Sequence, residues 1–155
     1  MTQLTDSNEK TREVVELKIA ARPENISLAR LALSGVAAAA GAPAEVVADL
    51  RLAVSEACTN AVQYAYPDGP SGPDRYVIVR FTVGGHRLIV EVTDFGGGLE
   101  SRVAAAWDEP VDGRLGMGLS IMRAVTDELE IASGEDGTGT RVTFSRGFGP
   151  AGEPS

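Results

Sequence analysis

The chain of 155 residues has very little of the residue types that build disulfide frameworks and metal clusters. It contains one cysteine, Cys58, and one histidine, His86. A single cysteine cannot form an internal disulfide, which fits a reducing compartment, and a single histidine builds no histidine metal cluster. We therefore expect Cys58 to be a small, buried, apolar residue on a helix and His86 to be exposed.

Long apolar runs and an excess of basic residues are also missing. The apolar stretches are far shorter than the roughly 20 residues that cross a bilayer, and residues 1–10 lack the apolar centre of a signal peptide. The 22 Asp and Glu residues outnumber the 14 Lys and Arg residues, so the formal net charge is −8. We expect a cytoplasmic protein that binds neither membranes nor nucleic acid, because a phosphate backbone requires a basic patch.

The composition that remains is typical of a folded globular protein. Hydrophobic residues make up 43% of the chain and charged residues 23%, and the length suits one domain with a single core. We expect a flexible leader over residues 1–12, a folded domain over 13–146 and a flexible tail over 147–155.

The spacing of apolar residues predicts strands where it alternates and helices where it follows a period of 3.6 residues. The expected elements are a strand at 15–19, helices over 23–40 and 43–64, strands at 77–83 and 88–92 joined by a turn at Gly84-Gly85, a helix over 116–127, and strands at 129–131 and 142–144. Hairpins combined with a helix layer predict an α+β fold, a two-layer sandwich with helices on one face of one sheet.

Glu56 and Asn60 are four residues apart on a predicted helix, so they project from the same side. The side-chain carbonyl of Asn60 is a suitable ligand for Mg²⁺, which prefers oxygen, and Glu56 could orient or deprotonate a hydroxyl. The alternative is that both residues decorate a solvated helix face.

Asp94 ends a buried strand and is followed by Gly96 and Gly98. A carboxylate here could accept a hydrogen bond from the exocyclic amine of adenine, although Asp is also common in turns for local reasons. Thr140 follows a Gly-Thr-Gly segment and could place a hydroxyl beside Asp94; the alternative is ordinary β propensity.

Gly116-Met117-Gly118 open a predicted helix. The free N–H groups and the dipole of a helix N-terminus attract anions, and Arg114 just before it is suitably placed for a terminal phosphate. Glycines also make ordinary turns, so this segment alone is weak evidence.

Together and in this order, these segments resemble the Bergerat-fold ATPases of the GHKL superfamily, and within it the small anti-sigma-factor serine kinases of bacteria. The resemblance runs from about Val14 to Phe144, and the segments most similar to this subgroup are 25–30, 54–61 and 114–122. It implies a mixed, largely antiparallel sheet. Sensor histidine kinases share the nucleotide motifs, but they normally carry a separate dimerisation domain that we do not expect here.

The resemblance also implies a role for each motif. Glu56 would be the general base on a partner's serine or threonine hydroxyl, Asn60 would hold Mg²⁺, and Asp94, helped by Thr140, would bind the adenine amine. The residues that would line ATP and its phosphates are Gly96, Gly98, Gly116, Met117 and Gly118, with Arg114 at the γ-phosphate and residues 99–113 as the ATP lid.

The implied function is partner switching in the cytoplasm. The protein would bind Mg-ATP, sequester an alternative sigma factor and phosphorylate an anti-anti-sigma protein, acting as a homodimer formed through the N-terminal strand and helix. Arg30 matches a position that contacts the sigma factor; the alternative is a solvated surface arginine. Two other functions stay open, namely an ATP-binding module without phosphate transfer and a kinase for a partner other than a sigma factor.

The family often has a His-Gly pair where this chain has Tyr64-Ala65, which alters the far wall of the pocket.

Overall fold

The described strands form one antiparallel sheet. The computed structural model describes residues 12–65, 75–96, 114–134 and 138–149. In these ranges the strand order is β1-β2-β3-β5-β4, and each neighbouring pair is antiparallel. The strands are β1 (Glu13–Ala20), β2 (Tyr76–Gly84), β3 (Arg87–Asp94), β4 (Glu128–Ser133) and β5 (Thr140–Gly147). The expected mixed sheet is therefore antiparallel throughout its described part.

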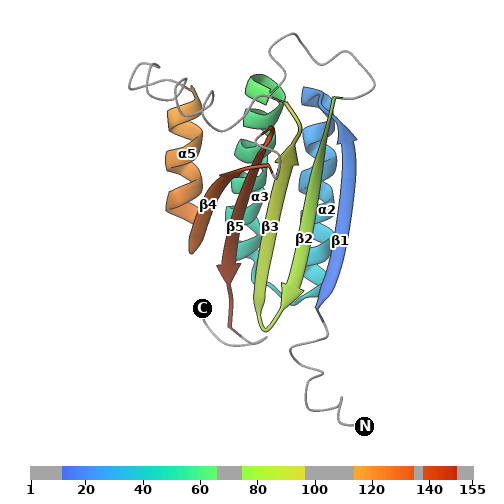
Figure 1. The fold of residues 1–155 in the computed structure, drawn as a ribbon. Helices are drawn as coiled ribbons and strands as arrows, with labels where there is room; N and C mark the ends of the chain where they lie inside the picture. Colours follow the sequence, from blue (N-terminus) through green and yellow to red (C-terminus); the bar gives the residue numbers. More distant parts are fainter. Residues whose placement is uncertain (1–11, 66–74, 97–113, 135–137, 150–155) are drawn as a thin grey trace.

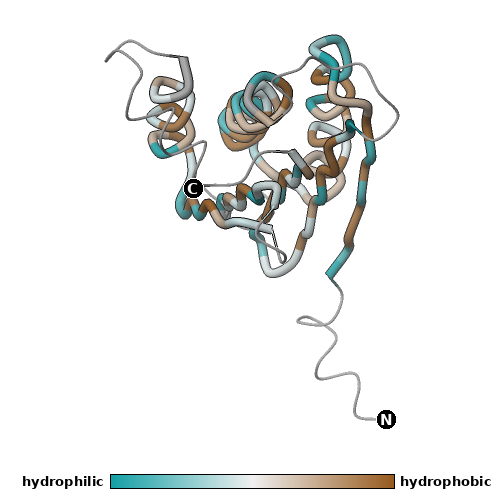
Figure 2. The backbone as a smooth tube through the Cα atoms, turned by 45° about the horizontal axis from the view of Figure 1, so that its top comes forward, coloured by the Kyte–Doolittle hydropathy of each residue, from teal (hydrophilic) through white to brown (hydrophobic). Residues whose placement is uncertain are grey.

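The helices cover one face of this sheet, as predicted (Figure 1). They are α2 (Ile26–Ala39), which follows the 3₁₀ turn η2 (Pro23–Asn25); α3 (Ala44–Asn60), which continues into the π-helical turn η3 (Ala61–Ala65); and α5 (Arg114–Val125). Figure 2 shows them side by side as one layer, which confirms the two-layer α+β sandwich. Within the described ranges, none of the helices has the length and apolarity needed to cross a bilayer.

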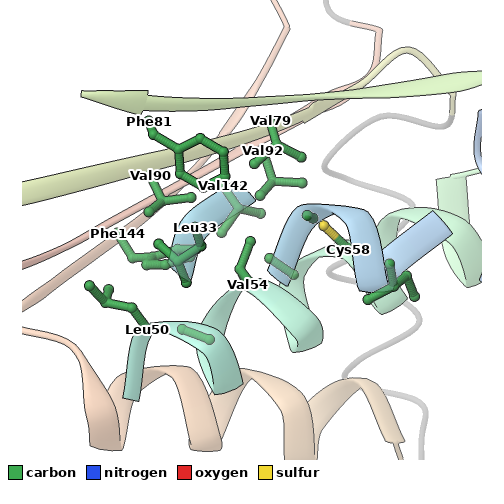
Figure 3. Close-up of a cluster of buried hydrophobic side chains, with 14 of the residues drawn as sticks. Leu33, Leu50, Val54, Cys58, Val79, Phe81, Val90, Val92, Val142 and Phe144 are labelled. Atoms are coloured by element: carbon green, nitrogen blue, oxygen red, sulfur yellow. The ribbon is translucent and has the colours of Figure 1, made fainter. Parts of the chain in front are cut away.

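The core lies between the two layers. Alternate residues of the central strands point toward the helices and are fully buried, as Phe81 and Phe144 show. Leu50 and Val54 on α3 and Leu33 on α2 meet them from the other side (Figure 3). Each such side chain contributes roughly 1.5–3 kcal/mol by leaving water, so α3 is held firmly over the middle of the sheet.

The β2–β3 turn lies one residue later than predicted. Gly84 pairs with Arg87, and the two residues between them, Gly85 and His86, have φ angles of 58° and 60°. A two-residue hairpin with both central residues at positive φ matches the twist of the strands. The turn is therefore at Gly85-His86, while the prediction that His86 is exposed is confirmed.

Two element ends also differ from the prediction. Helix α5 begins at Arg114 rather than Gly116. Strand β5 continues to Gly147, and Phe148 is buried with its N–H donating to the carbonyl oxygen of His86 at 2.9 Å. Residues 147 and 148 thus belong to the fold and not to a tail. The expected leader up to residue 11 and the expected lid at 99–113 lie outside the described residues.

Candidate functional site

The last turns of α3 carry Glu56 and Asn60 on one side, as their spacing predicts. Asn60 is only 3% exposed, and within the described part of the chain its side-chain Oδ1 has no hydrogen-bond partner. Leaving such a buried acceptor unpaired costs about 1–3 kcal/mol, and an unpaired group of this kind calls for an explanation. A role as a metal ligand would explain why this side-chain oxygen has no hydrogen-bond partner among the described residues.

Gly118 of α5 lies directly against these two side chains. A Cβ atom at Gly118 would stand 2.8 Å from Glu56 Oε1, 3.5 Å from Asn60 Nδ2 and 3.6 Å from Asn60 Oδ1. The N-terminal part of α5 therefore reaches the carboxylate and the amide at very close range. The structure thus brings Gly118 next to Glu56 and Asn60, although Glu56 and Gly118 are 62 positions apart in the sequence.

A second cluster forms where β3 ends. Asp94 pairs with Thr140 in the antiparallel register of β3 and β5, and both side chains are buried. The backbone N–H of Gly96 donates to Asp94 Oδ1 at 3.2 Å, which orients the carboxylate. The predicted juxtaposition of Asp94 and Thr140 is thus confirmed as geometry.

Close backbone packing ties this strand end to its neighbours. A Cβ atom at Gly96 would lie 1.9 Å from the carbonyl oxygen of Ala65, at the end of η3. Gly139 has a φ of 73°, its own Cβ would lie 2.2 Å from the carbonyl oxygen of Asp94, and its N–H donates to the Gly96 oxygen at 3.1 Å. No side chain fits at either glycine, so η3, the end of β3 and the start of β5 meet at this point through backbone atoms.

The remaining predicted nucleotide residues are only partly placed. Gly116 is half-buried in the first turn of α5, and Met117 beside it is exposed. Arg114 is the first residue of α5, and its side chain is not described. Gly98 lies outside the described residues.

The donor set suits a magnesium ion that arrives with a nucleotide. Among the residues that the structure describes, no three His, Cys, Asp or Glu side chains gather as a metal cage. Mg²⁺ in nucleotide sites commonly uses one or two protein oxygens and completes its shell with phosphates and water. The side-chain oxygen of Asn60, which has no partner among the described residues, fits that requirement.

Arg30 of α2 packs against Ser55 of α3, the sequence neighbour of Glu56. Its Nη1 donates to Ser55 Oγ at 3.4 Å, and Ser55 Oγ donates to the carbonyl oxygen of Arg51 at 2.8 Å. These residues belong to a groove of about 270 Å³ between α2 and α3, lined by Arg30, Ala48, Arg51, Leu52 and Ser55. The arginine is thus half-buried at the edge of a groove rather than standing free in solvent.

Cys58 is part of the core and not a nucleophile, as predicted. It is fully buried among apolar side chains (Figure 3), and burial raises the pKa of its thiol to about 12 against a smaller opposing effect of the Arg30 charge. A protonated, inaccessible thiol does not react.

Sequence reasoning missed several contributors to these sites. The sequence singles out Ala65 only as a departure from a His-Gly pair and assigns no role to Gly139, although the Gly-Thr-Gly pattern signals a tight approach. Arg51 and Leu52 join Arg30 in the groove through tertiary packing of α2 on α3, for which the sequence carries no local signal.

Comparison with known proteins agrees with this geometry. Residues 19–146 match the family described as Histidine kinase-like ATPase domain. The chain is 39% identical over 145 residues to the Serine-protein kinase RsbW of Bacillus pumilus, covering 87% of this chain and 88% of that protein. It is 32% identical over 142 residues to the Anti-sigma F factor of Caldanaerobacter subterraneus, covering 88% and 94%.

Solved structures share the fold. The RsbU and RsbW domains of Rv1364c from Mycobacterium tuberculosis superpose with a TM-score of 0.65 at 23% identity, covering 92% of this chain and 35% of that one. The SiaB-SiaC complex from Pseudomonas aeruginosa gives a TM-score of 0.62 at 14% identity, covering 96% and 98%. With the family match spanning most of the folded chain, we conclude that this protein belongs to the histidine kinase-like ATPase domain family.

Proposed function

We propose that this protein is an ATP-dependent serine/threonine kinase that also acts as an anti-sigma factor. It binds Mg-ATP, sequesters an alternative sigma factor and phosphorylates an anti-anti-sigma protein. The observation that supports this best is the buried Oδ1 of Asn60, which lies beside Glu56 and Gly118 and has no hydrogen-bond partner in the part of the chain that the structure describes. The names of the relatives, Serine-protein kinase RsbW and Anti-sigma F factor, point to the same two activities.

In this proposal the Asp94 cluster holds the base of the nucleotide. The carboxylate accepts a hydrogen bond from the adenine amine, and the buried hydroxyl of Thr140 assists it from the neighbouring strand. Guanine carries no amine at that ring position, so the pair selects ATP over GTP. A buried site built to hydrogen-bond one partner rejects a ligand that leaves it unpaired.

The Asn60 cluster and the start of α5 hold the phosphates. Asn60 Oδ1 is the protein ligand of Mg²⁺, which supplies charge neutralisation when bound. The positive end of the α5 dipole attracts the phosphates, Gly116, Met117 and Gly118 line this end of the helix, and the charge of Arg114 serves the γ-phosphate. Phosphoryl transfer depends on this positioning and charge neutralisation more than on covalent chemistry by the protein.

Glu56 prepares the attacking group. Its carboxylate takes the proton of the partner's serine or threonine hydroxyl while that oxygen bonds to the γ-phosphorus and ADP leaves with the electrons of the broken bond. Glu56 lies next to Asn60 without being buried as deeply, so a protein substrate can reach it.

Transfer of the γ-phosphate tests the proposal. Wild-type protein should label a candidate anti-anti-sigma protein from labelled ATP. Glu56→Ala should slow labelling by about 10²–10⁴-fold, the usual contribution of a general base, while ATP affinity is retained. Wild type that binds ATP and a sigma factor but labels no candidate would favour the binding module, and wild type that retains no sigma factor would favour a kinase for another partner.

The groove beside Arg30 is the proposed partner surface. Two arginines, Arg30 and Arg51, line it together with Leu52, and Leu28 and Leu31 on α2 are exposed as well, Leu31 by 71%. Basic and apolar groups in a chain of net charge −8 suit a partner segment that carries acidic and apolar side chains. Arg30→Glu should therefore abolish sigma-factor retention in a pull-down while leaving ATP binding unchanged.

We place the protein in the cytoplasm as a homodimer formed through the N-terminal strand. Strand β1 is the edge of the described sheet, and its Val14 and Val15 are exposed. Two antiparallel copies of β1 centred on Leu17 would set each Glu16 opposite Lys18 of the second copy, which is a favourable cross-strand pair. Glu16→Lys should weaken the dimer in sedimentation experiments, and adding Lys18→Glu should restore it.

A further inference from the structure

We propose that Gly118 is a positioning residue for the Glu56 carboxylate. The missing side chain at this point of α5 leaves the space in which Glu56 Oε1 stands. This inference rests on the proposed kinase function, in which Glu56 is the base, and it adds a role to a glycine otherwise assigned only to the phosphates.

The distances single out Glu56. A Cβ at Gly118 would lie 2.8 Å from Glu56 Oε1, well inside the contact distance of about 3.5 Å at which heavy atoms attract. The same Cβ would lie 3.5 Å and 3.6 Å from the two terminal atoms of Asn60, which is ordinary contact. An alanine would therefore displace the carboxylate and leave the amide in place.

The two glycines of this segment differ in what they face. Among the residues that the structure describes, a Cβ at Gly116, two residues earlier on α5, meets nothing within 4 Å. The contact with Glu56 therefore distinguishes position 118 from position 116 in the described structure.

An alanine at 118 should impair the chemical step rather than the fold. The atom that it meets is the far end of a flexible side chain, which can rotate away while both helix backbones stay in place. Misplacing a catalytic group by about 1 Å can cost 10²-fold in rate. We expect Gly118→Ala to lower kcat for phosphate transfer by about 10- to 100-fold and to change KM for ATP by less than about threefold.

Rescue by a shorter base separates positioning from a general defect. Glu56→Asp should lower kcat strongly in the wild-type background, yet cost less than about twofold when added to Gly118→Ala, because residues in contact do not act additively. Gly116→Ala combined with Glu56→Asp should instead be additive. Gly35→Ala on α2, where a Cβ meets no described residue within 4 Å, is the matched helix control and should leave kcat unchanged. Additive losses for Gly118→Ala and Glu56→Asp would overturn the proposal.

A crystal structure of Gly118→Ala tests the positioning without any activity. We expect the Glu56 carboxylate to be rotated away from position 118 with α3 and α5 unmoved and the melting temperature unchanged or raised. An unmoved carboxylate with the two helices pushed apart would overturn the inference. A wild-type protein that transfers no phosphate would overturn the kinase function instead, while this structure would still decide where the carboxylate stands.

Discussion

Asp94 of β3 and Thr140 of β5 are directly paired across the two strands. Both side chains are buried, at the end of the sheet where β3 ends and β5 begins. The pair comes from strands that lie 46 positions apart in sequence, counting from 94 to 140, yet the antiparallel register aligns them directly. A cross-strand pair held by two backbone ladders has little freedom to move, so its hydrogen-bonding groups are fixed before a ligand arrives.

Replacing Asp94 by Asn should weaken ATP binding by about 10- to 100-fold, since hydrogen bonds to charged groups contribute about 1.5–3 kcal/mol. The new amide can present a donor toward the donor of the adenine amine. Isothermal titration calorimetry measures the loss. Glu91→Gln, on the same strand but the opposite face of the sheet, is the control and should bind ATP like wild type; equal affinity of Asp94→Asn and wild type would remove Asp94 from the base site.

Asn60→Ala should abolish magnesium-dependent nucleotide binding and leave the fold intact. The lost oxygen is the one that stays unpaired within the described structure, so removing it also removes a buried unsatisfied acceptor. The melting temperature should therefore change by no more than about 4 °C, which is roughly 1–2 kcal/mol for a chain of this size. Titrations with and without Mg²⁺ provide the measurement, with the exposed Gln63→Ala as control; a magnesium effect that persists in Asn60→Ala would contradict the metal role.

Gly139→Ala should destabilise the protein by about 3 kcal/mol or more, because it combines a positive φ with a collision against the Asp94 carbonyl oxygen. Gly41→Ala is the matched comparison, since Gly41 has a φ of 80° and a Cβ there would meet none of the described residues within 4 Å. That variant should lose only about 1–2 kcal/mol, the cost of the left-handed backbone alone. Denaturant unfolding gives both values, and equal losses would show that the close approach at Gly139 contributes nothing.

Cys58 should make stability depend on pH in the alkaline range only. Its folded pKa of about 12 lies above the ordinary value of 9.0, so the unfolded chain releases the thiol proton first. The contribution of Cys58 to stability is fully present below pH 9 and is lost as the pH rises from about 9 toward about 12. The difference between wild type and Cys58→Ala in unfolding free energy should shrink over this window, and iodoacetamide should label wild type only after unfolding; rapid labelling of the native protein at pH 8 would contradict this.

The sequence predicted most of the fold because its information is local. Alternating Val77, Val79 and Phe81 specify one buried strand face, and the stripe on α3 specifies one buried helix face. The hairpin turn was placed one residue early, because Gly84-Gly85 is the more obvious pair of glycines, whereas the structure uses Gly85 and His86. The position of the turn depends on how β2 and β3 pair, Gly84 with Arg87. The alternation of residues within one strand does not encode this register.

For the candidate site, the sequence predicted where several residues lie on their helix or strand, but not the contacts between them. Glu56 and Asn60 share a helix side by simple periodicity, and Asp94 ends a strand by pattern. The approach of Gly118 to Glu56 and of Gly96 to Ala65 depends on how the helix layer sits on the sheet. The π-helical turn that carries Ala65 could not be inferred either, since it arises from packing at the end of α3.

Arg146 of β5 anchors the C-terminal end of α5. It pairs with Asp49 of α3 and donates to the carbonyl oxygen of Val125, the last residue of α5, at 3.0 Å. The next residues are tied to β5 as well, through the N–H of Asp127 bonded to the Ser145 oxygen at 2.8 Å. Because these contacts hold that end of α5, we expect any displacement of the helix to be largest at its other end, in the turn that faces Glu56.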